Sequence, residues 1–443
     1  MTLKDRLENV AVLGAGGKMG SGISLLLAQE MALQKLQPEN RSRGYQLTLM
    51  DVNPEALKGL QEYLQAQGRK FAQKNAETLK PLLPGTGSAE ELETQFVNHL
   101  TAMLNPVTDL NAVGNSRMVF EAILEKLELK VRVYKQLKAN TSGETYFFTN
   151  TSSIPIKELD KQAGLEGRII GFHFYNPPAV QKLVELIIPK NIRPDLPELS
   201  RELGKRLGKI IISSNDVAGF IGNGHFMRDG LHGIAEAERL GNEMGLAAAI
   251  YALNRVSQDF LIRPMGIFQL IDYVGLDIFQ SILKIMDPYF PKETLHSKLI
   301  DKLVEKGVKG GQFPDGSQKD GFLKYEGGKP AGVYDPESGQ YRLFGEGDWT
   351  AKADEKIGPL PQGHAPWKAL LKDEHRAAAL KTYFANLTAA GTPGAKLALA
   401  YLKRSKAIGQ QLVSGGVADS ADDVNGVLMN GFFHLYGPVN EYV

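Results

Sequence analysis

A histidine and a glutamate stand in apolar surroundings where they could provide general-base chemistry. The segment from Tyr146 to Ile188 contains three apolar runs; His173 ends the second run, and Glu185 lies inside the third. A buried carboxylate without a hydrogen-bond donor is costly, so Glu185 needs a partner. A reversal through Pro177-Pro178 would bring the third run back beside His173. The sequence therefore predicts a His–Glu pair at strand ends, with the imidazole oriented to act as a base.

Polar residues follow the first two of these apolar runs. Asn150-Thr151-Ser152-Ser153 comes directly after Phe148, and Asn176 follows His173 by three residues. A lone histidine at a strand end is usually structural, and a lone glutamate in a strand usually marks an edge. Both together, beside an Asn/Ser-rich strand end, favour a catalytic interpretation without excluding the structural one.

The opening of the chain has the pattern of a dinucleotide-binding unit. Val10 to Leu13 is a short apolar run, and a segment with helical periodicity starts near Ser21. Such a turn lets the backbone approach a pyrophosphate at a helix N-terminus. Its glycine spacing is GxGxxxG, one residue longer than GxGxxG, which leaves open which amides would bind the phosphates. The residues between strand and helix are Gly14, Ala15, Gly16, Gly17, Lys18, Met19 and Gly20.

An acidic residue ends the second expected strand, Gln46 to Met50. Asp51 at this position can accept hydrogen bonds from the adenosine ribose, and its charge would repel a 2′-phosphate, so it favours NAD over NADP. Asp51 could instead be a helix N-cap or a turn residue, because Asn53-Pro54-Glu55 comes next.

Composition excludes several classes of protein. The 443 residues suffice for two or three domains, and the hydrophobic fraction of 43% and charged fraction of 23% are those of a globular protein. The net charge of +1 does not indicate nucleic-acid binding, and the absence of cysteine excludes disulfides and thiol catalysis. Neither a signal segment nor a membrane-spanning run is evident, so a soluble, cytoplasmic protein is expected.

The motifs NTSS (from Asn150), HFYNPP (from His173) and KLVELI (from Lys182) together resemble the signature region of the L-3-hydroxyacyl-CoA dehydrogenases. The resemblance covers about two thirds of the chain and returns more weakly near its end. It implies NAD as the cofactor, no metal, and oxidation of an L-3-hydroxyacyl-CoA in fatty-acid β-oxidation. His173 would take the hydroxyl proton, and Glu185 would hold the imidazole.

The resemblance also assigns residues outside this region. Ser152 and Asn223 would bind the reacting oxygen, and Asn150 and Asn176 would contribute cofactor or substrate contacts. A helical hairpin at about 54–105 would lean towards the CoA moiety with basic residues such as Lys70, although a solvated helix face explains any single lysine equally well. Positions near the nicotinamide match Ala122, Glu125 and Lys130, the last two of which could be exposed helix charges.

The expected fold class is α/β: a Rossmann-type dinucleotide-binding domain followed by all-α C-terminal domains. The boundaries we expect are a NAD-binding domain at 1–215, a first helical domain at 216–306, an irregular connection at 307–365 and a second helical domain at 366–443. Residues 420–443 echo residues 247–275, which indicates a duplicated helical unit. Smaller members of the family often pair two such domains across a dimer interface, so the second copy would fill that place within one chain.

Two other functions remain open from the sequence. A dehydrogenase of a free hydroxy acid would have no use for the basic hairpin, and a non-catalytic, crystallin-like relative would not need the Ser/His/Glu/Asn set. The expected partner is an acyl-CoA substrate, not nucleic acid or a membrane. Monomer and dimer both remain open, as does association with a hydratase or thiolase.

Overall fold

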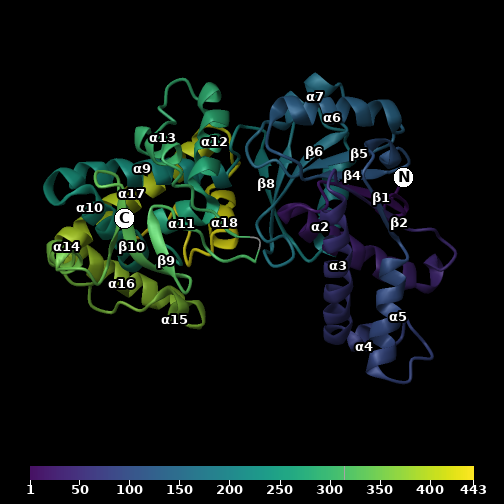
Figure 1. Ribbon diagram of the computed structural model, residues 1–443, viewed down its shortest axis with the longest axis horizontal. Coiled ribbons are helices and arrows are strands. Elements are labelled where there is room, and N and C mark those ends of the chain that lie inside the picture. Colours follow the sequence, from purple (N-terminus) through teal and green to yellow (C-terminus); the bar gives the residue numbers. More distant parts are fainter. Residues whose placement is uncertain (314) are drawn as a thin grey trace. The chain divides into compact units, whose positions relative to one another are not determined.

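The computed structural model describes residues 1–313 and 315–443, which form two compact units, Met1–Asp216 and Val217–Val443 (Figure 1). The first unit contains an eight-stranded sheet in the order β3-β2-β1-β4-β5-β6-β7-β8. Strands β1 to β6 are mutually parallel, whereas β7 runs antiparallel to β6 and parallel to β8. The strands are β1 Asn9–Leu13, β2 Gln46–Met50, β3 Leu104–Val107, β4 Met118–Glu121, β5 Tyr146–Thr149, β6 Ile169–Phe174, β7 Leu183–Ile188 and β8 Ile210–Asn215.

This order is that of a dinucleotide-binding sheet. The chain adds β2 and β3 on one side of β1 and then continues with β4 on the other side, so the strand order reverses between β1 and β4. Ligands of such sheets bind outside the carboxyl ends of the strands at this reversal. The central strands β1, β4, β5 and β6 are mainly apolar and almost wholly buried, as expected when helices cover both faces. The predicted strand, glycine turn and helix at the chain's opening are therefore confirmed.

Helices cover the sheet and extend from it. Figure 1 shows α3 and α5 projecting as a hairpin with α4 at its tip. Phe71 and Phe96 stack inside the hairpin with their ring centroids 5.3 Å apart. The helical segments of this unit are α1 Leu3–Arg6, α2 Lys18–Leu36, η1 Pro38–Asn40, α3 Pro54–Lys74, α4 Ala76–Leu79, α5 Ala89–Thr101, η2 Leu110–Val113, α6 Leu127–Asn140, α7 Ile156–Ala163 and α8 Leu196–Arg206.

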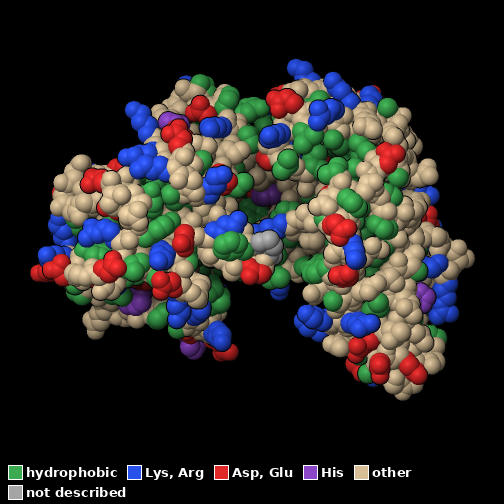
Figure 2. Space-filling view, in the orientation of Figure 1, with side chains coloured by type: hydrophobic (Ala, Val, Ile, Leu, Met, Phe, Trp, Pro, Cys, Tyr) green, Lys and Arg blue, Asp and Glu red, His purple; other side chains and the backbone are tan. Residues whose placement is uncertain are grey.

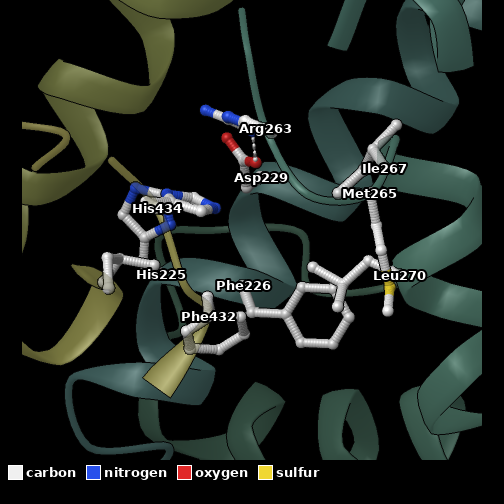
Figure 3. Close-up of a pocket in the computed structure, with 10 residues that line it drawn as sticks. His225, Phe226, Asp229, Arg263, Met265, Ile267, Leu270, Phe432 and His434 are labelled. Atoms are coloured by element: carbon white, nitrogen blue, oxygen red, sulfur yellow. Dashed lines mark hydrogen bonds and ion pairs between the residues drawn. The ribbon is translucent and has the colours of Figure 1, made fainter. Parts of the chain in front are cut away.

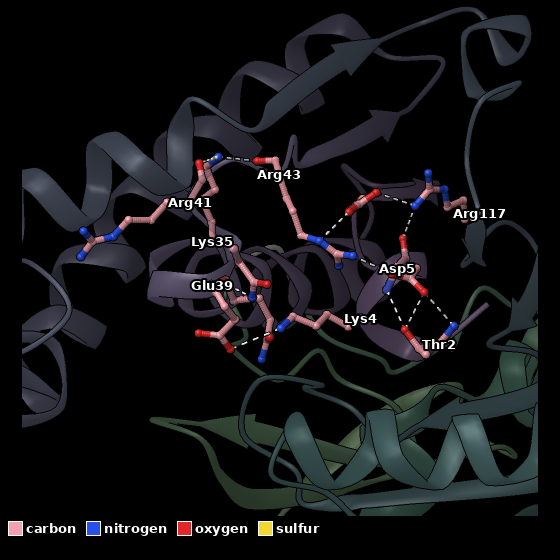
Figure 4. Close-up of polar contacts among 11 residues, drawn as sticks. Thr2, Lys4, Asp5, Lys35, Glu39, Arg41, Arg43 and Arg117 are labelled. Carbon is pink, nitrogen blue, oxygen red and sulfur yellow. Dashed lines mark hydrogen bonds and ion pairs between the residues drawn. The ribbon is translucent and has the colours of Figure 1, made fainter.

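A polar cluster secures the N-terminal segment to the amino ends of the strands (Figure 4). Thr2 caps α1 through the backbone N–H of Asp5, and the Asp5 carboxylate accepts from the Thr2 hydroxyl at 2.7 Å and from Arg43 at 2.8 Å. Arg117 donates to the carboxylate of Glu8 at 2.6 Å. Hydrogen bonds from Thr2 and then Arg43 hold the pKa of Asp5 well below its usual range.

The second unit is mainly helical. Its helical segments are α9 Gly222–Met244, α10 Leu246–Arg255, η3 Val256–Phe260, α11 Ile267–Val274, α12 Leu276–Met286, η4 Asp287–Tyr289, α13 Lys298–Glu305, α14 Trp349–Ile357, α15 Trp367–Leu371, α16 Arg376–Ala390, α17 Pro393–Ser414 and α18 Ala421–Gly431. The long helices α9 and α17 pack together, and Tyr401 on α17 donates to the backbone carbonyl of Asp229 on α9 at 3.0 Å.

A small antiparallel sheet corrects the expectation of an irregular connection at 307–365. It comprises β9 Leu323–Glu326, β10 Lys329–Asp335 and β11 Gln340–Leu343, in the order β11-β10-β9. Gly327 and Gly328 form the two-residue turn between β9 and β10 with φ of 56° and 76°, the conformation that suits a tight hairpin. Buried Asp272 anchors this sheet by accepting from the backbone N–H groups of Phe322 and Leu323 at 2.6 and 2.8 Å.

The same turn occurs twice in the second unit. Asn254 accepts through Oδ1 from the backbone N–H of Gln269 at 3.1 Å, and Asn425 accepts in the same way from Val439 at 3.0 Å. Eight residues after each asparagine comes a residue with positive φ, 49° at Ile262 and 55° at Phe433. Twelve residues after each comes a glycine, Gly266 or Gly437, whose hypothetical Cβ would lie within 2.2 Å of the asparagine oxygen. These shared features support the predicted duplication.

Candidate active site

His173 and Glu185 face each other across two strands. In the antiparallel pairing of β6 with β7 they are directly opposite, and His173 Nδ1 lies 3.5 Å from Glu185 Oε2. The Glu185 side chain is fully buried, and that of His173 is 11% exposed. The predicted return of the chain beside His173 is thus observed as a cross-strand pair. The spacing is longer than that of a strong hydrogen bond, as is common for catalytic pairs before substrate binds.

The turn between these strands is held from two sides. The Asn176–Pro177 peptide bond is cis, and Lys209, just before β8, donates to the carbonyl oxygens of Pro178 and Gln181 at 2.6 and 2.7 Å. Burial lowers the pKa of Lys209 to about 8. Helix α2 approaches the same turn at Gly22, where a Cβ would lie 2.9 Å from the Pro178 ring. The turn that carries Asn176 is therefore packed directly on the helix that follows the glycine turn.

Ser152 lies on a loop held by Glu125. The Glu125 carboxylate accepts from the hydroxyl of Thr151 and from the backbone N–H groups of Ser152 and Ser153, the last two at 2.9 and 3.2 Å. Lys130 Nζ lies 3.3 Å from the same carboxylate. The alternative that Glu125 and Lys130 are exposed helix charges is therefore wrong, because Lys130 is 1% exposed and Glu125 binds the loop.

Glu121 is a buried carboxylate that the sequence analysis missed. It ends β4, is fully buried, and accepts from Lys130 Nζ at 2.6 Å, Thr149 Oγ1 at 2.7 Å and Tyr134 Oη at 3.1 Å. Burial lowers the pKa of Lys130, but the charges of Glu121 and Glu125 outweigh this effect and raise it overall. The signal was present in the sequence, since Glu121 follows an apolar run just as Glu185 lies within one.

Asn150 joins the ends of two strands. Its side-chain oxygen accepts from the backbone N–H of Phe174 at 2.8 Å, which ties the end of β5 to the residue after His173. Asn150 and Ser152 follow β5, and His173 lies near the end of the neighbouring strand β6 opposite Glu185, so these residues lie at adjacent strand ends.

The glycine turn can accommodate a dinucleotide at the neighbouring strand end. Gly14 has φ of 69°, and a Cβ there would lie 2.6 Å from the carbonyl oxygen of Ala122; a Cβ at Gly20 would lie 2.0 Å from the carbonyl oxygen of Gly14. The Gly17 backbone N–H donates to Gly14 O at 3.0 Å, and Gly17 is the N-cap of α2. The residue by which this turn exceeds the GxGxxG spacing therefore lies before the helix. The first helical turn, with Lys18, Met19 and Gly20, then presents its backbone amides to a phosphate.

Asp51 borders this turn. Its Oδ2 accepts from the backbone N–H of Gly16 at 2.9 Å, and its Oδ1 accepts from that of Asn53 at 3.0 Å. The helix cap that follows is made by the Asn53 side chain. Asp51 itself therefore does not cap α3, but its hydrogen bond from Asn53 N makes it a turn residue, the other alternative that the sequence left open. Its role in binding the ribose hydroxyls stays a prediction.

Two predicted site residues lie on helices. Lys70 is exposed on α3, and Asn223 belongs to the first turn of α9 in the second unit. No cluster of metal-ligating side chains and no membrane-spanning helix is found among residues 1–313 and 315–443. On the face shown in Figure 2, acidic and basic side chains are interspersed without a large patch of either sign.

The second unit contains a small cavity, lined by both polar and apolar side chains, that Figure 3 shows in close-up. Arg263 and Asp229 form an ion pair at 2.9 Å beside His225 and His434. The cavity measures about 10 Å³, enough for about one water molecule, so it is too small for a substrate. Burial lowers the pKa of His225 and lowers that of His434 further.

Comparison with known proteins decides the family. The family model "3-hydroxyacyl-CoA dehydrogenase, NAD binding domain" matches residues 9–217, and the model of the C-terminal domain of the same enzymes matches residues 234–325. The mitochondrial hydroxyacyl-coenzyme A dehydrogenase of Homo sapiens is 30% identical over 335 residues, 72% of this chain and 92% of that protein. The chain belongs to the 3-hydroxyacyl-CoA dehydrogenase family. Its cofactor is therefore NAD, and its activity is that of an oxidoreductase acting on CH–OH.

Two further relatives extend the comparison. A peroxisomal fatty acid beta-oxidation multifunctional protein of Oryza sativa is 27% identical over 73% of this chain, which spans only 39% of that protein. The crystal structure of a 3-hydroxybutyryl-CoA dehydrogenase from Escherichia coli is 22% identical with a TM-score of 0.65, and the match covers 98% of this chain and 90% of that one. The similarity of fold therefore extends beyond residue 325, where the match to the family models ends, and includes the predicted second helical domain at 366–443.

Proposed function

We propose that this chain oxidises an L-3-hydroxyacyl-CoA to the 3-ketoacyl-CoA at the strand ends of its first unit, in a reversible NAD-dependent reaction. The observation that carries this proposal is the cross-strand pair of His173 with the fully buried Glu185. An imidazole held by a buried carboxylate is oriented in one tautomer and can accept a proton from a substrate hydroxyl.

His173 takes the proton of the C3 hydroxyl and carries it as the imidazolium. Glu185 holds the ring through Nδ1, so that Nε2 receives the proton, and its charge stabilises the imidazolium. Ser152, on the loop fixed by Glu125, donates a hydrogen bond to the reacting oxygen and fixes its geometry. The same role for Asn223 stays a prediction. In the reverse direction His173 returns the proton to the ketone oxygen.

NAD, when bound, accepts the hydride that leaves C3. Its pyrophosphate is held by the amides of the glycine turn, and Asp51 accepts the adenosine ribose hydroxyls while its charge disfavours a 2′-phosphate. Ala122, the Glu125–Lys130 pair and Asn150 would border the nicotinamide end. Ser152 and Asn176 contribute contacts from the neighbouring loops.

The acyl carrier is recognised by its charge. Exposed basic residues on the α3–α5 hairpin, with Lys70 among them, bind the phosphates of CoA as charge-assisted contacts. The rice relative supports a place in fatty-acid β-oxidation. The adjacent reactions would then come from a hydratase and a thiolase, either free in solution or associated with this chain, and a cytoplasmic location stays a prediction.

The decisive assay follows NADH oxidation with acetoacetyl-CoA, beside NADPH and beside free acetoacetate. We expect turnover only with NADH and the CoA ester. Activity on the free acid would instead indicate a hydroxy-acid dehydrogenase. Bound NAD without turnover of either substrate would indicate a non-catalytic relative.

A substitution of Glu185 tests the pair itself. Glu185→Gln should lower kcat by about 100- to 10,000-fold, because the imidazolium loses its charge partner and the tautomer is no longer fixed. The Kd for NAD, measured by calorimetry, should stay within about twofold. The matched control is Glu198→Gln, at a side chain that is 84% exposed on α8. Turnover of Glu185→Gln near that of the wild type would overturn the assignment.

A further inference from the structure

Tyr175 shares the carboxylate that orients His173. It follows β6 two residues after His173, so both side chains point to the same side of the strand. The Tyr175 hydroxyl donates to Glu185 Oε2 at 3.0 Å, the same oxygen that lies 3.5 Å from His173 Nδ1. The His173 and Tyr175 rings lie beside each other, with centroids 4.8 Å apart and planes inclined by 38°. The phenol and the imidazole thus share Glu185 Oε2, and the phenol is the nearer of the two.

The phenol is a permanent donor in this arrangement. Burial raises the pKa of Tyr175 well above its usual value, and the charge of Glu185 with the hydrogen bond between them raises it further. Tyr175 consequently stays protonated throughout the pH range in which a histidine titrates. A hydrogen bond donated to a carboxylate stabilises its charged form and reduces the charge that it offers to a second partner.

We propose that Tyr175 is a positioning residue for the dehydrogenase reaction: its hydroxyl fixes the Glu185 carboxylate opposite His173 and withdraws part of its negative charge from the imidazole. The inference rests on the function proposed above. It predicts that the phenol sets the pH at which His173 becomes available as a base. Without the hydroxyl, Glu185 would stabilise the imidazolium more strongly, and His173 would lose its proton only at higher pH.

Four titratable groups near these strands have partners of their own. They are Glu121, bound by Lys130 at the end of β4; Glu125, bound to the Ser152 loop; Lys209, bound to two carbonyl oxygens before β8; and Asp216, bound to the backbone N–H groups of Ile156 and Lys157 after β8. On the β8 side, Glu185 is paired with the apolar Ile212. Tyr175 shares Glu185 Oε2 with His173, so its removal should change the balance between Glu185 and His173.

The test compares Tyr175→Phe with the wild type in the oxidation of 3-hydroxybutyryl-CoA at saturating NAD. Log kcat/KM is measured from about pH 5 to 9.5, and its acidic limb reports the proton that must leave the base. We expect the midpoint of this limb in Tyr175→Phe to move to higher pH by about half a unit or more. The Kd for NAD should not change, because the phenylalanine ring keeps the packing beside His173.

The control is Tyr45→Phe, which removes a hydroxyl from a buried tyrosine that precedes β2 in the same unit. It should leave the acidic limb in place. A second variant, Tyr175→Leu, also removes the hydroxyl and should shift the limb in the same direction if the phenylalanine variant does not fold. In either variant, titration of the His173 ring by NMR provides a midpoint that does not depend on activity.

The outcomes separate the two proposals. A wild-type enzyme without activity on the CoA ester would overturn the proposed function. An active wild type whose acidic limb and His173 titration are unchanged in both Tyr175 variants would overturn the role of Tyr175 alone. A shift to lower pH would also overturn it, because the phenol would then not compete with His173 for Glu185.

Discussion

The buried pair of Lys130 with Glu121 permits a quantitative prediction. Lys130→Met keeps most of the side-chain volume but removes the ammonium that lies 2.6 Å from a fully buried carboxylate. Breaking a buried pair by removing one partner costs about 3–5 kcal/mol, because the other charge remains uncompensated. Glu121 would keep three donors, from Ile123 N, Thr149 Oγ1 and Tyr134 Oη. We therefore expect the lower end, about 3 kcal/mol of unfolding free energy.

Urea denaturation measures this cost. With a urea dependence of about 2 kcal/mol per molar, the midpoint should fall by about 1.5 M when followed by far-UV circular dichroism. Both tryptophans, Trp349 and Trp367, lie in the second unit, so tryptophan fluorescence shows whether that unit unfolds separately. The control is Lys135→Met, at an exposed lysine on the same helix, which should change the free energy by no more than about 0.5 kcal/mol.

The reasoning would be refuted if Lys130→Met were as stable as the control. A second variant separates charge from packing. Adding Glu121→Gln to Lys130→Met removes the uncompensated charge and should recover part of the lost stability. If the double variant were less stable than Lys130→Met by a further 3 kcal/mol or so, the two residues would contribute through packing and not as a charge pair.

Three further predictions concern acid stability, the turn after His173 and assembly. The pKa of Asp5 is lowered in the folded state, so its charge stabilises the wild type at neutral pH, and this stability is lost as the pH falls below about 4. Asp5→Asn should remove this contribution, so the urea midpoints at pH 7 and pH 3 should differ less in the variant than in the wild type. Gly22→Ala should lower kcat/KM by about tenfold or more, because its Cβ would meet the Pro178 ring at 2.9 Å, whereas Gly59→Ala, with no atom within 4 Å, should raise stability by up to about 1 kcal/mol. Size-exclusion chromatography with light scattering should give the mass of one chain, and a dimer formed through the first helical domain would contradict the proposed role of the second copy.

Local signals predicted the nucleotide end and the His–Glu pair. The glycine turn is a short-range feature, and the pair required only two apolar runs with a reversal between them. Glu121 was missed because its partners lie 9, 13 and 28 residues further along the chain, at Lys130, Tyr134 and Thr149. Nothing in the local pattern shows that these side chains converge on one carboxylate; only the parallel pairing of β4 with β5 brings Thr149 opposite Glu121.

The three-stranded sheet was missed for a different reason. Its strands contain Gly, Pro and Lys, and these residues indicated an irregular connection. The pair Gly327-Gly328 between two short alternating segments was nevertheless a hairpin signal. Asp272 anchors the sheet by accepting from the backbone N–H groups of Phe322 and Leu323, which lie about 50 residues further along the chain. The secondary-structure propensities of local segments do not predict such a long-range anchor.

The duplicated turn has an evolutionary consequence. In an assembly of two identical chains, every substitution is introduced twice, once on each side of the symmetry axis. Here the two copies of the turn lie at different positions of one chain, so a substitution can change one copy and leave the other unchanged. They already differ directly after the residue with positive φ, where one copy has Arg263 and the other His434. Each copy of the turn can therefore vary independently, while both copies are always present in equal number because they lie in one chain.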